Sequence, residues 1–330
     1  MLLPNVFRPT TENWQDAWGG MGTPDAVGGQ AVELRDGLKI DRIGGCVLEV
    51  APGKGMGPLH WHRFEEELFF VLSGELTVRE LRPGHSDYVE YGLGAGELVA
   101  YPPNTRIAHC SFNRSQAPVR YLALSDGWHT SEIAHYSDSG KTLLRGAGVL
   151  GAFDSDLPVA EHIARARAQA AARSVRTLTR QQRPAWVQGP DRVAERDLEN
   201  GCFGRALARA AGATAIFLHS DRLTPGAVSG PLHWHSEDEE LALVLEGSPT
   251  LRQLRDGEEE RMVLRPGDVV AWLPRDKVAH QLLNEGDADA RVAVVGTCRP
   301  DDVVVLPEQR RFVARGLERS GSMDRAGYWD

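Results

Sequence analysis

Short apolar runs alternate with turn sequences along the first half of the chain. The runs are rich in Val, Leu and Tyr and occupy residues 46–50, 68–72, 76–81, 88–91, 98–101, 108–112 and 119–124. Between them lie turn sequences such as RPGHSD and GLGAG, which favour an antiparallel meander. Many short strands at this spacing are typical of a sandwich or closed barrel, so we predict an all-β fold.

Residues 155–173 have a different period and predict a helix. Ser155 or Asp156 can cap its N-terminus, and Pro158 suits its first turn. Apolar side chains share one face of this helix: Val159, Ile163, Ala166 and Ala170. We therefore expect a helical connection in the middle of the chain.

The second half of the chain repeats the first. GPLHWH occurs at residues 57–62 and again at 230–235, and each copy is followed at the same spacing by a glutamate, Glu67 or Glu240. A further set keeps its spacing in both halves: Gly96, Pro103, His109 and Asn113 correspond to Gly267, Pro274, His280 and Asn284. Only 11 of the 330 residues are His, and six of them occupy matched positions. Chance does not explain this agreement, so the chain contains two copies of one unit.

The matched residues are those of a metal site. Alternate side chains of a strand point to the same face, so His60 and His62 project together, and a glutamate on the next strand can meet them. Glu66 is an alternative to Glu67 for this role, and the repeat favours Glu67 because it matches Glu240. Three imidazoles and one carboxylate suit a divalent ion of iron, manganese, nickel, cobalt, copper or zinc. We predict up to two such ions per chain.

The motif H-x-H-x4-E-x6-G followed by H-x3-N resembles that of the cupin superfamily, and its two copies resemble a bicupin. The resemblance covers about two thirds of the chain, residues 32–135 and 198–312. It implies two tandem cupin barrels, each a double-stranded β-helix or jelly roll, joined by a helical linker. It also implies two sets of metal ligands: His60, His62, Glu67 and His109 in the first barrel, and His233, His235, Glu240 and His280 in the second.

The sequence departs from the family pattern in two places. Neither copy has the usual Gly after the motif Pro, which alters a turn but leaves the ligands in place. The HWH triplet resembles that of oxalate decarboxylases, but that family has an Arg three residues before the first His. Gly57 and Gly230 stand there in this chain, which weakens the oxalate interpretation.

The repeat and the predicted helix together divide the chain into five segments. We expect an N-terminal arm over 1–30, a first cupin domain over 31–154, a helical linker over 155–196, a second cupin domain over 197–315 and a tail over 316–330. The arm is expected to pack on a barrel or on a neighbouring subunit. Because arms beside cupin barrels commonly join subunits, a homo-oligomer is one alternative that the sequence leaves open.

Composition narrows the classes of partner. The chain has 42% hydrophobic residues and a net charge of −9, with no long basic run. These features argue against nucleic acid or an anionic membrane as the main partner, so we expect a small-molecule substrate. The N-terminal sequence lacks the apolar run of a signal peptide, and the four Cys have no paired spacing, which favours a cytoplasmic location with reduced thiols.

The predicted walls of the two cavities differ. Strand alternation directs Phe69 into the first cavity, where the second has Ala242. By equivalence, the pair Cys46 and Leu48 of the first half is replaced by two polar residues, His219 and Asp221. A His or Asp beside a metal ion can act as a general acid or base, so we hypothesise that the C-terminal site is catalytic and that His219 and Asp221 take part. The alternative is that His219 only terminates a strand.

The resemblance to bicupins implies several activities. The first interpretation is a metal-dependent dioxygenase, an oxidoreductase that places O2 and a chelating organic substrate on one metal ion. The second is a non-redox lyase or decarboxylase, similar to oxalate decarboxylase but without its Arg. The third is a module that binds a small molecule or metal without turnover. Because one fold hosts many chemistries, the choice depends on the site itself.

Overall fold

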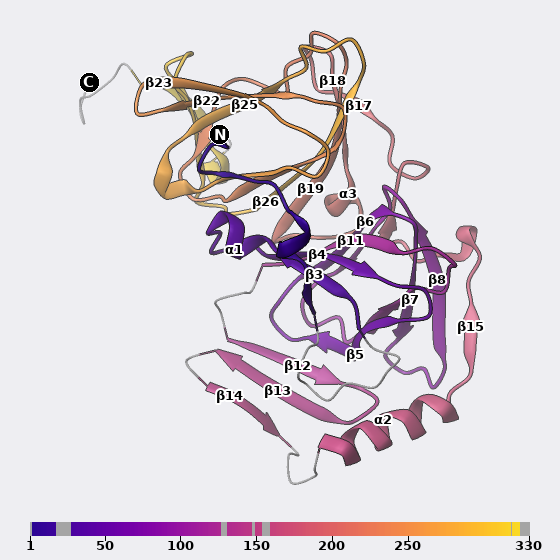
Figure 1. Ribbon diagram of the computed structural model, residues 1–330. Coiled ribbons are helices and arrows are strands. Elements are labelled where there is room, and N and C mark those ends of the chain that lie inside the picture. Colours follow the sequence, from indigo (N-terminus) through magenta and orange to yellow (C-terminus); the bar gives the residue numbers. More distant parts are fainter. Residues whose placement is uncertain are drawn as a thin grey trace.

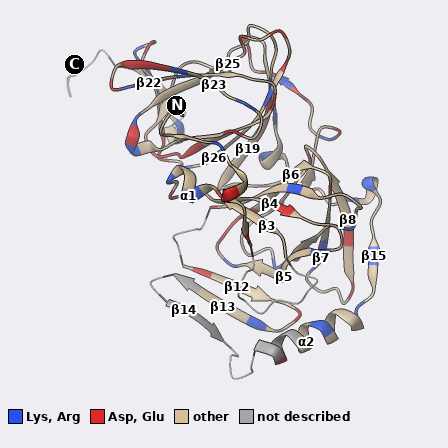
Figure 2. Ribbon diagram, in the orientation of Figure 1, with Lys and Arg blue, Asp and Glu red and all other residues tan. Residues whose placement is uncertain are grey.

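The chain folds into two β-lobes that lie against each other, with one long helix at the outer edge of the first lobe (Figure 1). The computed structural model describes residues 2–17, 28–126, 131–146, 149–153, 159–317 and 319–323. Acidic and basic residues are interspersed over the described parts of both lobes (Figure 2).

The first lobe is a barrel made of two facing sheets. Its strands are β2 (Gln15–Asp16), β3 (Gln30–Glu33), β4 (Gly44–Val50), β5 (Gly55–His62), β6 (Glu67–Ser73), β7 (Glu75–Leu81), β8 (Tyr88–Gly94), β9 (Leu98–Tyr101), β10 (Ala108–Phe112), β11 (Val119–Ser125), β12 (Glu132–Tyr136), β13 (Lys141–Gly146), β14 (Val149–Phe153), β15 (Val175–Thr177) and β16 (Val187–Gln188). One sheet has the order β16-β9-β6-β11-β4-β3-β2, and the other has the order β14-β13-β12-β5-β10-β7-β8-β15. Each of the seven apolar runs predicted from the sequence forms a strand, which confirms the all-β prediction for this half.

The second lobe repeats this arrangement. Its strands are β17 (Arg196–Asp197), β18 (Cys202–Ala206), β19 (Ile216–Leu223), β20 (Trp234–His235), β21 (Glu240–Glu246), β22 (Thr250–Arg255), β23 (Glu258–Val263), β24 (Val269–Trp272), β25 (Ala279–Leu283), β26 (Ala290–Thr297), β27 (Val303–Leu306), β28 (Arg311–Ala314) and β29 (Arg319–Ser322). They form the sheets β24-β21-β26-β19-β18-β17, β23-β22-β25 and β20-β27-β28-β29. Strand β29 lies within residues 316–330, for which the sequence predicts a tail.

Helices are few among the described residues. The α-helices are α1 (Leu34–Leu38), α2 (Val159–Ala172) and α3 (Leu207–Ala210), and the 3-10 helices are η1 (Thr11–Asn13), η2 (Arg180–Gln182), η3 (Pro274–Asp276) and η4 (Arg315–Leu317). Helix α2 confirms the helix predicted between the two barrels, whereas the predicted capping residues Ser155, Asp156 and Pro158 lie outside the described residues. No described helix has both the length and the apolar character needed to cross a lipid bilayer.

The segment before each barrel pairs with the other barrel. Strand β1 (Val6–Phe7), from the N-terminal arm, pairs with β24 of the second barrel, and β16, which follows α2, pairs with β9 of the first. Side chains reinforce the exchange, because Asn5 donates to Gln253 of the second barrel and Trp186 donates to Glu80 of the first. Each barrel is therefore paired with a segment that precedes the other barrel in the sequence.

The barrels also share one hydrophobic core. It contains Leu68, Phe70, Leu122 and Leu124 from the first barrel and Leu241, Leu243, Ala293 and Val295 from the second, all buried. Along β6, Leu68 and Phe70 alternate with Glu67 and Phe69, which line the inner cavity. Strand alternation thus gives the sheet that contains β6, and its counterpart that contains β21, one face toward its own cavity and one face toward the other barrel.

Two buried carboxylates bind backbone across this interface. Glu66 accepts hydrogen bonds from the amides of residues 214–216 at 2.7 to 3.0 Å, and Glu239 accepts from the amides of residues 41–43 at 2.7 to 3.0 Å. The two glutamates stand at equivalent positions of the repeat, immediately before Glu67 and Glu240, and the two segments that they bind are equivalent as well. Each barrel therefore supplies a carboxylate that satisfies three amides of the other.

Loss of one such carboxylate is expected to destabilise the protein. In Glu66→Ala the three amides lose their acceptor at a buried interface, which we expect to lower the free energy of unfolding by about 3 kcal/mol. Glu246→Ala is the control, since this side chain is exposed and its ion pair with Arg291 is worth no more than about 1 kcal/mol. Denaturant unfolding of both variants measures the difference, and equal midpoints would contradict the prediction.

Candidate metal centres

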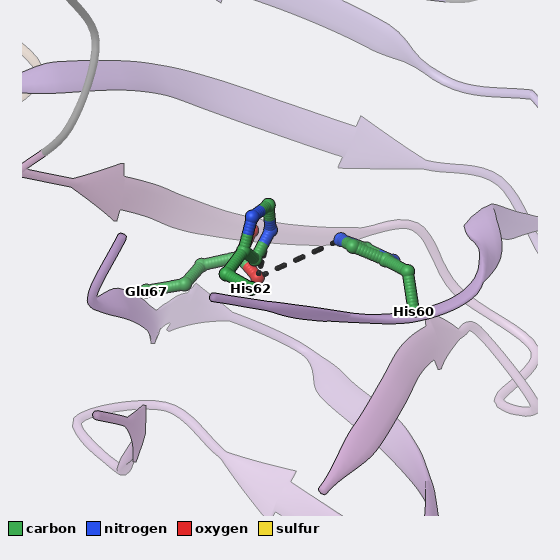
Figure 3. Close-up of side chains that lie close together, drawn as sticks. All are labelled: His60, His62 and Glu67. Atoms are coloured by element: carbon green, nitrogen blue, oxygen red, sulfur yellow. Dashed lines mark ion pairs between the residues drawn. The ribbon is translucent and has the colours of Figure 1, made fainter. Parts of the chain in front are cut away.

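The first cluster of ligand-type side chains lies inside the first barrel. Strand β5 presents His60 and His62, β6 begins at Glu67, and β10 places His109 directly opposite His60 in the strand register. In Figure 3 the side chains of His60 and His62 both point toward the Glu67 carboxylate. The Glu67 Oε2 atom lies 2.6 Å from Nε2 of His109, 3.6 Å from Nε2 of His62 and 3.9 Å from Nε2 of His60. All four predicted side chains therefore meet at one point.

The second barrel repeats the cluster. Oε2 of Glu240 lies 3.1 Å from Nε2 of His235 and 3.8 Å from Nε2 of His233, and Oε1 lies 3.6 Å from Nε2 of His280. His233 faces His280 across an isolated β-bridge, as His60 faces His109 in the first barrel. The structure thus brings together all four predicted side chains in this half too.

Backbone carbonyls orient four of the imidazole rings. The Nδ1 atoms of these rings lie 2.8 to 3.1 Å from carbonyl oxygens two residues earlier: His60 to Pro58, His109 to Ile107, His233 to Pro231 and His280 to Val278. A carbonyl oxygen only accepts, so Nδ1 of each ring carries a proton and the Nε2 atom is directed at the cluster. Nε2 of His280 is buried and has no hydrogen-bond partner among the described residues. This donor arrangement fits a divalent metal ion.

Burial also sets the charge states of the clusters. It lowers the pKa of His60 to about 3 and that of His280 to about 4, so both rings are neutral near pH 7. Burial opposes ionisation of Glu67, but the hydrogen bond with His109 and the neighbouring imidazoles outweigh it and lower its pKa to about 2. The neutral ring of His60 therefore offers an unprotonated Nε2 atom beside an anionic carboxylate, the state in which these groups bind metal.

Comparison with known proteins agrees with this architecture. The family model described as "Cupin domain" matches residues 46–125 and 221–296, one match in each half. This protein is a bicupin. The germin-like protein 1 of Brassica napus is 29% identical to it over 101 residues, which is 29% of this chain and about half, 47%, of that protein's length.

Solved structures of two oxalate decarboxylases have a similar fold. The Lactobacillus farciminis enzyme, in its formate complex, is 15% identical with a TM-score of 0.59, covering 94% of the bicupin and 90% of that chain. The Bacillus subtilis enzyme, which has Mn(II) centres, is 14% identical with a TM-score of 0.57, covering 89% and 77%. At such low identity the likeness establishes the fold alone.

Acidic residues outside the predicted sets hold the second His of each H-x-H pair. Nδ1 of His235 lies 2.8 Å from Oδ2 of the buried Asp302, and Nδ1 of His62 lies 3.4 Å from Oε1 of the buried Glu132. Burial opposes a charge on His235, but Asp302 and Glu240 together raise its pKa to about 10, so a metal ion binding there displaces a proton at neutral pH. Sequence reasoning missed both carboxylates, although each stands shortly after the last long strand of its barrel, β11 or β26.

An aromatic ring covers the last His of each set. The ring of Tyr101 stacks on His109 with centroids 3.6 Å apart, and Trp272 stacks on His280 at 3.8 Å. Tyr101 donates to the buried Glu80, and Trp272 donates to Gln253, which fixes both rings. These stacks hold the imidazole planes, and the sequence analysis did not identify them.

The first cluster opens into a cavity of about 250 Å³. Phe69, Cys46 and Leu48 line it, as strand alternation predicts, and none of its described lining residues is Lys or Arg. Trp61 faces the other way and stacks on His135 with centroids 4.2 Å apart. Glu66, the alternative to Glu67, directs its carboxylate to the second barrel instead of to this cavity.

His219 and Asp221 lie on the inner face of the second barrel. The register through β26 aligns His219 with Ala242 and Asp221 with Val244, on the same sheet face as Glu240. Asp221 is only 7% exposed, and its Oδ1 atom has no hydrogen-bond partner among the described residues. Burial and the charge of Glu240 raise the pKa of Asp221 to about 7, and burial lowers that of His219.

Room for the Asp221 carboxylate comes from a glycine on the neighbouring strand. A Cβ atom placed on Gly204 would lie 2.5 Å from Oδ1 of Asp221. In the first barrel the aligned pair is Ala31 and Leu48. Relative to the first barrel, the second therefore has Asp221 in place of Leu48 and Gly204 in place of Ala31, and the smaller residue makes room for the carboxylate.

Metal content is expected to separate the two centres. We expect His109→Ala and His280→Ala each to lose one equivalent of divalent metal per chain, because each removes a ligand from one cluster only. Asp302→Asn should retain the C-terminal ion with about 10- to 100-fold weaker affinity, since it removes the acceptor that orients His235. Elemental analysis and metal titration measure these changes. Wild-type stoichiometry and affinity in all three variants would contradict the assignment.

Proposed function

We propose that this bicupin is a metal-dependent lyase that removes CO2 from a small organic carboxylate, and that the C-terminal centre is its catalytic site. The observation that carries the proposal is the buried Asp221 carboxyl with its unpartnered Oδ1, on the same face as the Glu240 cluster. A divalent ion held by His233, His235, Glu240 and His280 would bind a substrate carbonyl oxygen one carbon beyond the carbon that bears the carboxylate, and would stabilise the negative charge that develops on that oxygen as CO2 leaves.

Asp221 supplies the proton that decarboxylation requires. When the carbon–carbon bond to the carboxylate breaks, CO2 leaves and the electron pair stays on the substrate carbon. The neutral carboxyl of Asp221, whose pKa lies near 7, donates its proton to that carbon and is then protonated again from solvent. His219, neutral and two residues away on β19, can hold a polar group of the substrate by a hydrogen bond.

Both solved structures described above are of oxalate decarboxylases, which favours this reaction class for the present chain. Oxalate itself fits less well. Gly230 stands where that family has an Arg, and a Cβ atom added there would meet nothing within 4 Å. We therefore propose a 3-oxo carboxylate, whose C3 carbonyl oxygen can bind the metal and accept the electron pair that remains when CO2 leaves.

A dioxygenase is the second candidate, and the first cavity favours it. Leu48, Met56 and Phe69 make this cavity largely apolar, and no Lys or Arg lies among the residues that the structure describes along its wall. Such a wall suits an uncharged or aromatic chelator and O2 better than a dianion. A module that binds a metabolite without turnover is the third candidate.

Gas exchange distinguishes the three candidates. We expect the metal-loaded protein to release CO2 from 3-oxo carboxylates without stoichiometric oxygen uptake, because decarboxylation exchanges CO2 for a proton. Turnover is followed by CO2 release and by an oxygen electrode, with His280→Ala as the control. Equimolar oxygen consumption would instead identify a dioxygenase, and binding without either gas change would identify a binding module.

The pH dependence tests the role of Asp221. Its acid form is lost as the pH rises through about 7, so we expect kcat/KM to fall over that range. Asp221→Asn should keep its metal but lose about 100- to 10,000-fold in kcat, and its residual activity should no longer show this fall. Asp289→Asn, a half-exposed surface change, is the control. A normal rate in Asp221→Asn would refute the assignment.

A further inference from the structure

We propose that Glu66 of the first barrel is a positioning residue for the C-terminal centre, and that Glu239 of the second barrel is its counterpart for the N-terminal centre. The catalytic consequence rests on the proposed function, whereas the structural link between the two centres does not. Each glutamate lies next in sequence to a ligand of its own barrel, yet its carboxylate binds the backbone of the other barrel.

Glu66 holds the start of the strand that forms the polar wall of the second cavity. Its Oε1 accepts from the amides of Ala215 and Ile216 at 3.0 and 2.9 Å, and its Oε2 accepts from Thr214 at 2.7 Å. Ile216 is the first residue of β19, the strand that carries His219 and Asp221. A displacement of Glu66 therefore moves the strand from which both side chains project.

Glu239 makes the reciprocal contact. Its carboxylate accepts from the amides of Asp41 and Arg42 at 2.7 Å and from Ile43 at 3.0 Å. Strand β4 begins immediately afterwards and carries Cys46, which lines the first cavity. The link thus runs in both directions, from the ligand strand of each barrel to the cavity wall of the other.

Neither glutamate can adjust freely. Glu66 is fully buried and Glu239 is 2% exposed. The backbone amide of Glu66 donates to Asp126 at 2.7 Å, and that of Glu239 donates to Thr297 at 3.1 Å. Packed, fully paired groups transmit a shift instead of absorbing it, because loss of any of these hydrogen bonds leaves a buried polar group unpaired.

Metal binding at one centre should therefore change the metal affinity of the other. An ion that pulls Glu67 into coordination also fixes Glu66, the residue beside it, and so fixes the start of β19. Coupling between sites in proteins commonly changes affinity by about 5- to 150-fold, and it is reciprocal. We expect Mn(II) at the N-terminal centre to tighten Mn(II) binding at the C-terminal centre by about tenfold, and the reverse.

Single-centre variants test the coupling without turnover. In His280→Ala, Mn(II) binds the N-terminal centre alone, and we expect it to slow hydrogen exchange of the amides of residues 214–216 across the interface. In His109→Ala, Mn(II) at the C-terminal centre should likewise slow exchange of residues 41–43. No exchange change across the interface in either variant would overturn the proposal, and this measurement needs no change at Glu66.

Substitution of Glu66 in the first barrel should change the metal centre of the second barrel. We expect Glu66→Gln in the His109→Ala background to change the Mn(II) EPR spectrum of the C-terminal centre and weaken its affinity about fivefold or more. Glu246→Gln in the same background is the matched control and should change neither. A spectrum of the C-terminal centre that Glu66→Gln leaves unaltered would refute the positioning role.

The readouts separate this proposal from the proposed function. Coupled exchange and a changed spectrum without any CO2 release would uphold the link and refute the lyase. CO2 release with an unaltered C-terminal spectrum in Glu66→Gln would uphold the lyase and refute the positioning role of Glu66.

Discussion

Two carboxylates, Glu67 and Glu240, are buried at the centres of the two barrels, and the need to compensate their charge organises the side chains around them. Burial of an unpaired carboxylate is costly, so each is surrounded by three imidazoles within 3.9 Å. Backbone carbonyls and aromatic rings orient those imidazoles with their Nε2 atoms inward. The result in each half is a preformed donor set for a divalent cation, whose charge would complete the compensation.

The same strands also hold the two barrels together. Because side chains alternate along a strand, β6 presents Glu67 to the cavity and Leu68 to the shared core. At the edge of that core, Glu66 and Glu239 exchange hydrogen bonds with the backbone of the opposite barrel. The metal clusters, the interface and the cavity walls are therefore parts of one continuous structure, which is the physical basis for the coupling that we propose between the centres.

The two centres share a donor set but differ in their surroundings. The first opens into an apolar cavity with Phe69 and Leu48 in its wall, whereas the second has Asp221 and His219 on the corresponding strand. The carboxylates behind the second His of each pair lie at different distances as well: Asp302 lies 2.8 Å from His235, and Glu132 lies 3.4 Å from His62. The two copies of one unit thus form two chemically distinct sites, and only the second has an Asp and a His on this strand.

The sequence by itself determined the strand pattern, helix α2, the two-barrel architecture and the eight side chains that meet in the clusters. It could do so because strand alternation and the repeated GPLHWH motif are local or periodic signals, and they placed Asp221 on the cavity face as well. Tertiary structure alone decided the rest. Asp302 contacts His235 from 67 residues further along the chain, Tyr101 stacks on His109 from a strand of the other sheet, and β1 pairs with the other barrel. Glu66 and Glu239 occupy equivalent positions of the repeat, but the repeat alone does not show what either side chain contacts. The backbone segment that each carboxylate binds depends on how the barrels pack. Buried amides need an acceptor, and only the packed interface determines which acceptor lies within reach.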